Sequence, residues 1–141
     1  MSRLIALLAF CVLCAGCKIE FKTPEKELRT VLDGQLSALN AEEMEKVMSY
    51  TWEDAPMFDQ QFDILQRIKQ LYDLKTSLVS CEYLGSSKDG TFAVILMKQK
   101  TEKVSGPEFK NNVVTTAVTF KKVSGAWKMW QSVTFAIDYV D

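Results

Sequence analysis

The sequence predicts an α+β fold in which three helices precede, and pack on, a four-stranded antiparallel sheet. Up to residue 72, apolar residues recur at the spacing of helices, and from residue 75 they follow the two-residue period of strands. Two turn signals, Asp89-Gly90 and Ser124-Gly125, and a loop that contains Gly106-Pro107 divide the second half into four strands. Because helices and strands are segregated along the chain, the pattern indicates an α+β domain.

Start and stop signals predict three helices. Residues 23–25 read Thr-Pro-Glu, in which threonine can cap a helix, proline suits its first position and glutamate its positive end. Asn40 and Glu43 have capping-box spacing and predict a second helix over 40–52. Pro56 forces a break. A third helix is therefore expected over 59–72, with one apolar side made by Phe62, Leu65, Ile68, Leu71 and Tyr72.

Four strands are expected, over residues 75–84, 91–101, 112–123 and 126–139. The second is apolar on both faces, whereas a sheet with one wet face should alternate with polar residues. In the fourth strand, strict alternation predicts that one face holds Trp127, Met129, Val133 and Phe135. Trp130 then points outward.

The two-sided apolar character of the sheet predicts an interface. An exposed apolar patch usually marks one. We expect a homodimer or partner contact with Trp130 near its centre and with Ile95 and Met97. The alternative is that the C-terminal tail or loop 101–110 covers this face.

Residues 1–17 have the pattern of a secretory signal peptide. Arg3 gives a basic start, residues 4–13 are apolar and uncharged, and small residues precede Cys17. The alternative is a transmembrane anchor. That alternative would need about 20 apolar residues, and Lys18 ends the run first.

The ending Ala15-Gly16-Cys17 resembles the lipobox of bacterial lipoproteins, although Cys14 stands where leucine is usual. In that family the cysteine receives diacylglycerol and becomes the first residue after cleavage. The resemblance implies an exported protein, lipid-anchored in the cell envelope, with residues 18–22 as a spacer. Because no aspartate follows Cys17, it also implies the outer membrane, facing the periplasm. An ordinary cleavage site with a stray cysteine is the alternative.

Composition narrows the function classes. The 141 residues carry 17 basic and 18 acidic side chains, and this balance argues against a nucleic-acid binder. There is no histidine, and Cys81 is the only cysteine left in the mature domain besides Cys17. No zinc cluster, calcium loop, phosphate loop or nucleophile turn is present. We therefore expect no metal and no cofactor, and we interpret Cys81 as a buried small hydrophobe.

The order of elements, the short second helix and the hairpin Val123-Ser124-Gly125-Ala126-Trp127-Lys128-Met129 resemble the nuclear transport factor 2-like, or SnoaL-like, superfamily. That superfamily includes ketosteroid isomerase and scytalone dehydratase. The likeness covers roughly residues 24–140, within a domain expected over 23–141. It implies a cone-shaped, cystatin-like domain. A curved sheet would wrap the first helix and leave a pocket at the open end, which members use for catalysis or ligand binding.

The resemblance supplies pocket residues but no catalytic ones. Tyr50, Trp52 and Phe58 flank the break between the second and third helices, which borders the pocket in this superfamily. They are expected to line an apolar groove, and ordinary core filling is the alternative. Scytalone dehydratase-like chemistry uses histidine, and the ketosteroid isomerase motifs are unmatched. The nearby acids, expected to be solvated, are Glu53, Asp54, Asp59 and Asp63.

The sequence therefore favours a non-catalytic, lipid-anchored envelope protein that binds a small apolar ligand or an envelope partner protein. The alternative is an isomerase, dehydratase or cyclase-type enzyme with Asp54 or Glu82 as its base. A third interpretation is a purely structural accessory subunit with a closed pocket.

Overall fold

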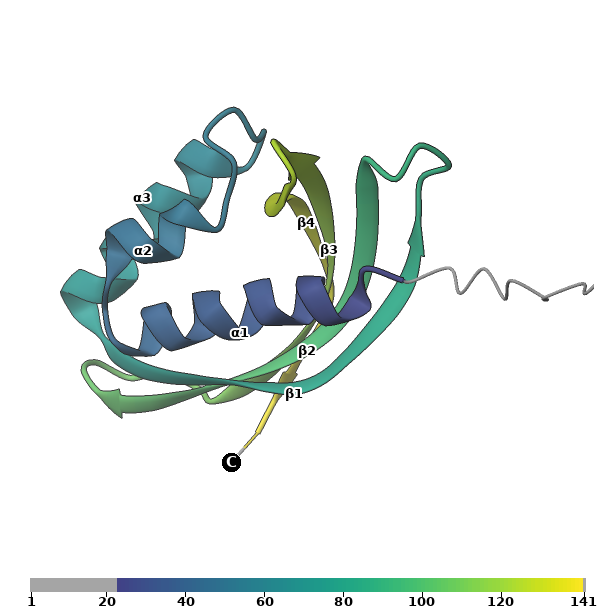
Figure 1. Ribbon diagram of the computed structural model, residues 1–141. Helices are drawn as coiled ribbons and strands as arrows, with labels where there is room; N and C mark the ends of the chain where they lie inside the picture. The colour runs from purple at the N-terminus through teal and green to yellow at the C-terminus, as the bar shows by residue number, and fades with distance from the viewer. Residues whose placement is uncertain (1–22, 141) are drawn as a thin grey trace, which may run out of the picture.

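The computed structural model describes residues 23–140 (Figure 1). Its helices and strands are α1 (Glu25–Asn40), α2 (Met44–Ser49), α3 (Phe58–Leu71), β1 (Asp73–Ser86), β2 (Phe92–Ser105), β3 (Asn112–Val123) and β4 (Ala126–Tyr139). The predicted α+β fold with three helices and a four-stranded antiparallel sheet is confirmed. The expected signal peptide, Cys17 and the 18–22 spacer lie outside the described residues.

The four strands form one antiparallel meander in the order β1-β2-β3-β4. Figure 1 shows the sheet curving around α1, with α2 and α3 gathered at one end of it. None of the helices in residues 23–140 is long and apolar enough to cross a bilayer. Residues of α3 and of the sheet together line a cavity, which is the candidate site described below.

The core lies between α1 and the concave face of the sheet. Leu28 and Leu32 are fully buried there, and the sheet meets them with Ala93, Ile95, Val118 and Phe120, which are buried to the same degree. Each fully buried large side chain contributes about 1.5–3 kcal/mol relative to an exposed one. The buried Trp127 adds a hydrogen bond between β4 and α1, because its indole N–H donates to the Glu27 carboxylate at 3.1 Å.

The helix starts differ from those predicted. No side-chain cap forms at α1, where the Leu28 amide donates to the Pro24 carbonyl at 2.9 Å. The capping box of Asn40 and Glu43 does not form either, and α2 begins at Met44. Asn40 instead ends α1, and its side chain makes hydrogen bonds to Thr76 of β1, two of them with the backbone at 2.8 Å. Its amide is used to join a helix to the sheet.

A β-bulge in β4 changes which side chains face the core. Phe120 pairs with Met129 while Thr119 pairs with Gln131, so Trp130 is an extra residue in β4. Because successive side chains of a strand alternate between faces, one inserted residue inverts the pattern beyond it. A second register shift follows further along β4, where Thr116 pairs with Thr134 and Thr115 pairs with Ala136, which leaves Phe135 without a partner in β3.

The bulge corrects one prediction. Trp127 and Met129 are buried as expected, but Val133 and Phe135 do not share their face and are 48% and 67% exposed. The expectation for those two side chains was wrong because it assumed strict alternation. The inverted pattern directs the next residues, Ser132 and Thr134, towards the space beneath α3.

Candidate ligand-binding cavity

Helix α3 stands away from the sheet. None of its 14 residues is buried, although its sequence is amphipathic. Two residues of the predicted apolar side, Phe62 and Leu71, are 43% and 57% exposed. The predicted apolar side of this helix therefore exists but is not packed against the core. A helix whose apolar side chains are not packed against the rest of the domain is suited to cover a ligand.

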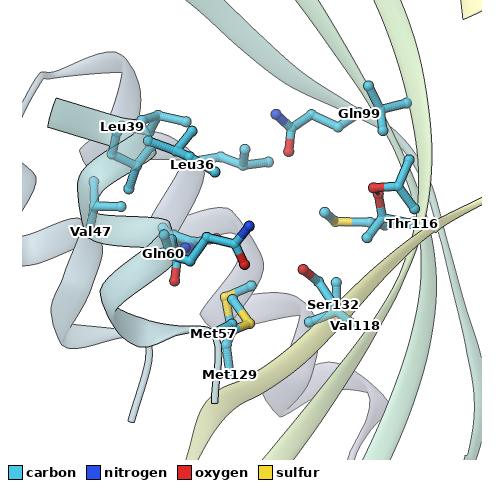
Figure 2. Close-up of a pocket in the computed structure, with 17 residues that line it drawn as sticks. Leu36, Leu39, Val47, Met57, Gln60, Gln99, Thr116, Val118, Met129 and Ser132 are labelled. Carbon is cyan, nitrogen blue, oxygen red and sulfur yellow. Dashed lines mark hydrogen bonds between the residues drawn. The ribbon is translucent and has the colours of Figure 1, made fainter. Parts of the chain in front are cut away.

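A cavity of about 470 Å³ lies beneath α3 (Figure 2). Its wall is made by α1, α2 and α3 on one side and by β2, β3 and β4 on the other. The lining residues are Gln35, Leu36, Leu39, Val47, Met57, Gln60, Gln61, Ile64, Leu65, Met97, Gln99, Val114, Thr116, Val118, Met129, Ser132 and Thr134. Figure 2 shows the helical side chains facing Gln99, Thr116 and Ser132 across open space.

The lining contains amides and hydroxyls but no charged side chain. Some of these groups already have a partner. Gln61 Oε1 accepts a hydrogen bond at 2.8 Å from the Thr51 hydroxyl, which lies outside the lining, and the Thr116 and Thr134 hydroxyls, which both line the cavity, lie 3.4 Å apart. Gln60 and Gln99 reach into the cavity from opposite walls (Figure 2). The site therefore offers neutral hydrogen-bonding groups on an apolar surface.

The mouth of the cavity lies between α3 and β4. The lining residues that are also exposed are Gln60 and Ile64 on the helix, and Ser132 and Thr134 on the strand. A second hollow of about 170 Å³ continues under the C-terminal half of α3 and shares Leu39, Leu65 and Gln99 with the first. Together they form an elongated space along the helix.

The aromatic residues expected to line the pocket lie elsewhere. Tyr50 packs on α1, where a Cβ added to Gly34 would come within 2.5 Å of the Tyr50 hydroxyl oxygen. Trp52 and Phe58 come together, but they line a separate groove on the outside of the helices. None of the three lines the cavity beneath α3.

The residues expected at an interface fall on opposite faces of the sheet. Ile95 and Met97 are buried in the core, so assigning them to a surface was wrong. Trp130 lies on the outer face, with its ring 5.1 Å from that of Trp52 and 6.2 Å from that of Phe92, measured between centroids. Formation of a homodimer stays a prediction.

The titratable groups considered from sequence lie outside the cavity. Asp54 and Glu82 are both exposed and absent from its lining. Cys81 is half-buried against the core, and burial raises the pKa of its thiol above the ordinary value, so its reactive thiolate is disfavoured. Over residues 23–140, no group of three His, Cys, Asp or Glu side chains is placed to hold a metal ion.

Sequence reasoning missed the glutamines. Gln35 is buried, and it occupies the apolar face of α1 between Leu32 and Leu36. An uncharged polar residue within an apolar helix face was the sequence signal that could have identified Gln35 as a cavity residue. Gln60 and Gln61 on α3 gave a weaker signal, because glutamine is also common on exposed helix surfaces.

Comparisons with known proteins agree with this architecture. The chain superposes on a cystatin-like protein from Caulobacter vibrioides with a TM-score of 0.65 and 14% identity, covering 82% of this chain and 89% of that one. An NTF2-like protein from Pseudomonas putida KT2440 gives 0.64 and 10%, covering 79% and 85%. Bd1075 of Bdellovibrio bacteriovorus gives 0.63 and 13%, covering 78% of this chain but only 40% of that one.

At these identities the solved structures show the fold alone, which is nuclear transport factor 2-like and cystatin-like. No curated protein matches the sequence. A family model described as "Anti-sigma-I factor RsgI9, C-terminal domain" matches residues 30–140. Since this match spans most of the 141 residues, the chain belongs to the family of the anti-sigma-I factor RsgI9 C-terminal domain.

Proposed function

We propose that this domain binds a small, neutral, mainly apolar molecule beneath α3, and that lipid on Cys17 holds it at an envelope membrane. One observation carries the binding role. Helix α3 has no buried residue, yet it covers a cavity of about 470 Å³ whose lining holds no charged side chain.

The size and chemistry of the cavity define the ligand class. Small-molecule sites typically enclose about 300–1,000 Å³. A ligand there removes apolar surface of α3 from water, which contributes about 25 cal/mol for each Å² buried. The amides of Gln60 and Gln99 can pair with carbonyl or hydroxyl groups of a ligand. A charged ligand would lose hydration without meeting an opposite charge, so neutral molecules are favoured.

The same lining supports binding over the enzymatic alternative. A general base must lie within hydrogen-bond reach of the proton that it removes. The carboxylates that we considered as bases, Asp54 and Glu82, are solvent-exposed side chains outside the cavity. Glutamine, threonine and serine side chains position a neutral molecule without exchanging protons near neutral pH.

Native mass spectrometry of residues 18–141, purified gently from the natural host, tests the binding role. We expect a population that carries an additional small-molecule mass. The same protein, after organic extraction, should bind the neutral fluorescent probe N-phenyl-1-naphthylamine. A protein that carries no adduct and fails to bind the probe would contradict the proposal.

The anchoring part of the proposal rests on the sequence around Cys17. We expect the full chain, expressed in a Gram-negative bacterium, to fractionate with membranes and to gain the mass of at least two acyl chains. A single acyl chain holds a protein only marginally at a bilayer, whereas two chains hold it stably. Cys17→Ser should move the protein out of the membrane fraction, whereas Cys81→Ser, the matched control, should not. A Cys17→Ser protein that stays with the membranes would contradict lipid attachment at this residue.

A further inference from the structure

Another hollow, which we call the acidic groove, lies outside the helices. Its volume is about 640 Å³, and it shares no lining residue with the cavity beneath α3. It is formed by α2, the segment that follows, the start of α3 and the β3–β4 hairpin. The lining residues are Glu45, Met48, Ser49, Thr51, Trp52, Glu53, Phe58, Asp59, Phe62, Val123 and Lys128.

Aromatic side chains form the apolar part of the groove. Phe58 and Phe62 are one helical turn apart on α3, so they lie on the same side of that helix. Phe62 is 43% exposed. Trp52 makes a third side of the groove and is held in place by its contact with Trp130 and by the Lys121 ammonium, 4.0 Å from its ring centroid. Aromatic side chains that neighbouring residues hold in place are typical of the residues that contribute most to binding at protein interfaces.

Three carboxylates border the aromatic surface. Glu45, Glu53 and Asp59 are exposed, and none has a lysine or arginine nitrogen within salt-bridge distance in the part of the chain that the structure describes. Lys128 is the one cation in the lining, and its ammonium donates a hydrogen bond to the Ser49 carbonyl at 2.5 Å. The groove therefore combines an apolar surface with excess negative charge.

We propose that the acidic groove is a docking site for a basic segment of a partner protein that alternates lysine or arginine with apolar residues. The apolar side chains would pack on Phe58 and Phe62, and the basic ones would pair with Glu53 and Asp59. Complementary charges steer such an encounter, and buried aromatic contacts hold it. This partner is distinct from the ligand beneath α3, since the two hollows use separate residues.

The test uses residues 18–141 and a short fluorescent peptide of lysine and leucine, titrated by anisotropy at low and at moderate salt. We expect saturable binding that weakens about tenfold in Glu53→Lys/Asp59→Lys, because both charge pairs become repulsive. Phe62→Ser should weaken it by a similar factor at both salt concentrations. The matched control, Asp73→Lys/Asp138→Lys, reverses two exposed acids outside the groove lining and should retain wild-type affinity.

Two controls distinguish binding in the acidic groove from general charge attraction and from misfolding of the variants. Circular dichroism spectra and thermal melts that match the wild type would show that each variant is folded. Equal weakening by the groove and control pairs would overturn the proposal, because it would mean attraction by net charge. It would also be overturned if the peptide failed to bind, or if a glutamate-and-leucine peptide bound equally well.

Discussion

Ser132→Trp is expected to weaken ligand binding beneath α3 at least tenfold, while Gln131→Trp on the same strand leaves it intact. Ser132 lines the mouth of the cavity and is exposed there, so an indole at this position would occupy the entrance opposite α3. Gln131 pairs with Thr119 on the other face of the sheet. The two variants therefore add the same side chain at neighbouring residues, one inside the cavity and one outside it.

The measurement is a titration with N-phenyl-1-naphthylamine, supported by native mass spectrometry. We expect the dissociation constant of Ser132→Trp to rise at least tenfold, which corresponds to about 1.4 kcal/mol of binding free energy. Gln131→Trp should stay within about twofold of the wild type, and both variants should keep similar melting temperatures because both positions are exposed. If both variants bound the probe like the wild type, the cavity would not be its site.

Prediction of the fold from sequence succeeded where the signal is local and periodic. Leu28, Leu32 and Leu36 recur at helical spacing on α1, and all three are buried. Turn residues likewise located the hairpins: at the β1–β2 turn, Asp89 accepts hydrogen bonds from the Ser87 hydroxyl and the Thr91 amide. Such features depend on neighbours within a few residues, so the sequence contains the information needed to predict them.

The candidate site was harder to predict because it depends on how separate elements pack. The bulge at Trp130 is not marked by glycine or proline, yet it decides that Ser132 rather than Val133 faces the cavity. The gap beneath α3 likewise follows from the distance between a helix and a sheet. Periodicity located the apolar side of α3 but did not show whether another element fills the space against it.

The aromatic residues show how residues near a helical break can be assigned to the wrong hollow. Tyr50, Trp52 and Phe58 were expected to line the pocket, but none of them lines the cavity beneath α3, and Trp52 and Phe58 line a separate groove outside the helices. The segment before Phe58 pairs with the edge of β4, where the Trp52 amide donates to the Met129 carbonyl at 3.1 Å. At this edge Thr51 is buried and its hydroxyl donates to Gln61, whereas the ring of Trp52 packs on Trp130. The sequence did not predict this edge pairing.

Phe120→Ala should cost far more stability than Phe135→Ala. Phe120 is fully buried in the core, and removing a buried phenylalanine ring typically costs about 3–5 kcal/mol. Phe135 is 67% exposed, so its loss should change the free energy of unfolding by about 0.5 kcal/mol or less. Phe120→Leu, which keeps most of the apolar volume, should lose less than Phe120→Ala and provides a variant that stays folded.

Equilibrium urea denaturation of residues 18–141 measures these differences from the midpoints, provided that the slopes are equal. The comparison also tests the β4 bulge. With strict alternation along β4, Phe135 would share the helix-facing side with Trp127 and Met129, and its truncation would leave a hole in the core. With the extra residue at Trp130, the ring of Phe135 lies largely in solvent and its removal leaves no hole. A loss above about 2 kcal/mol for Phe135→Ala, within the range of buried truncations, would therefore contradict the β4 register and, with it, the placement of Ser132 in the cavity.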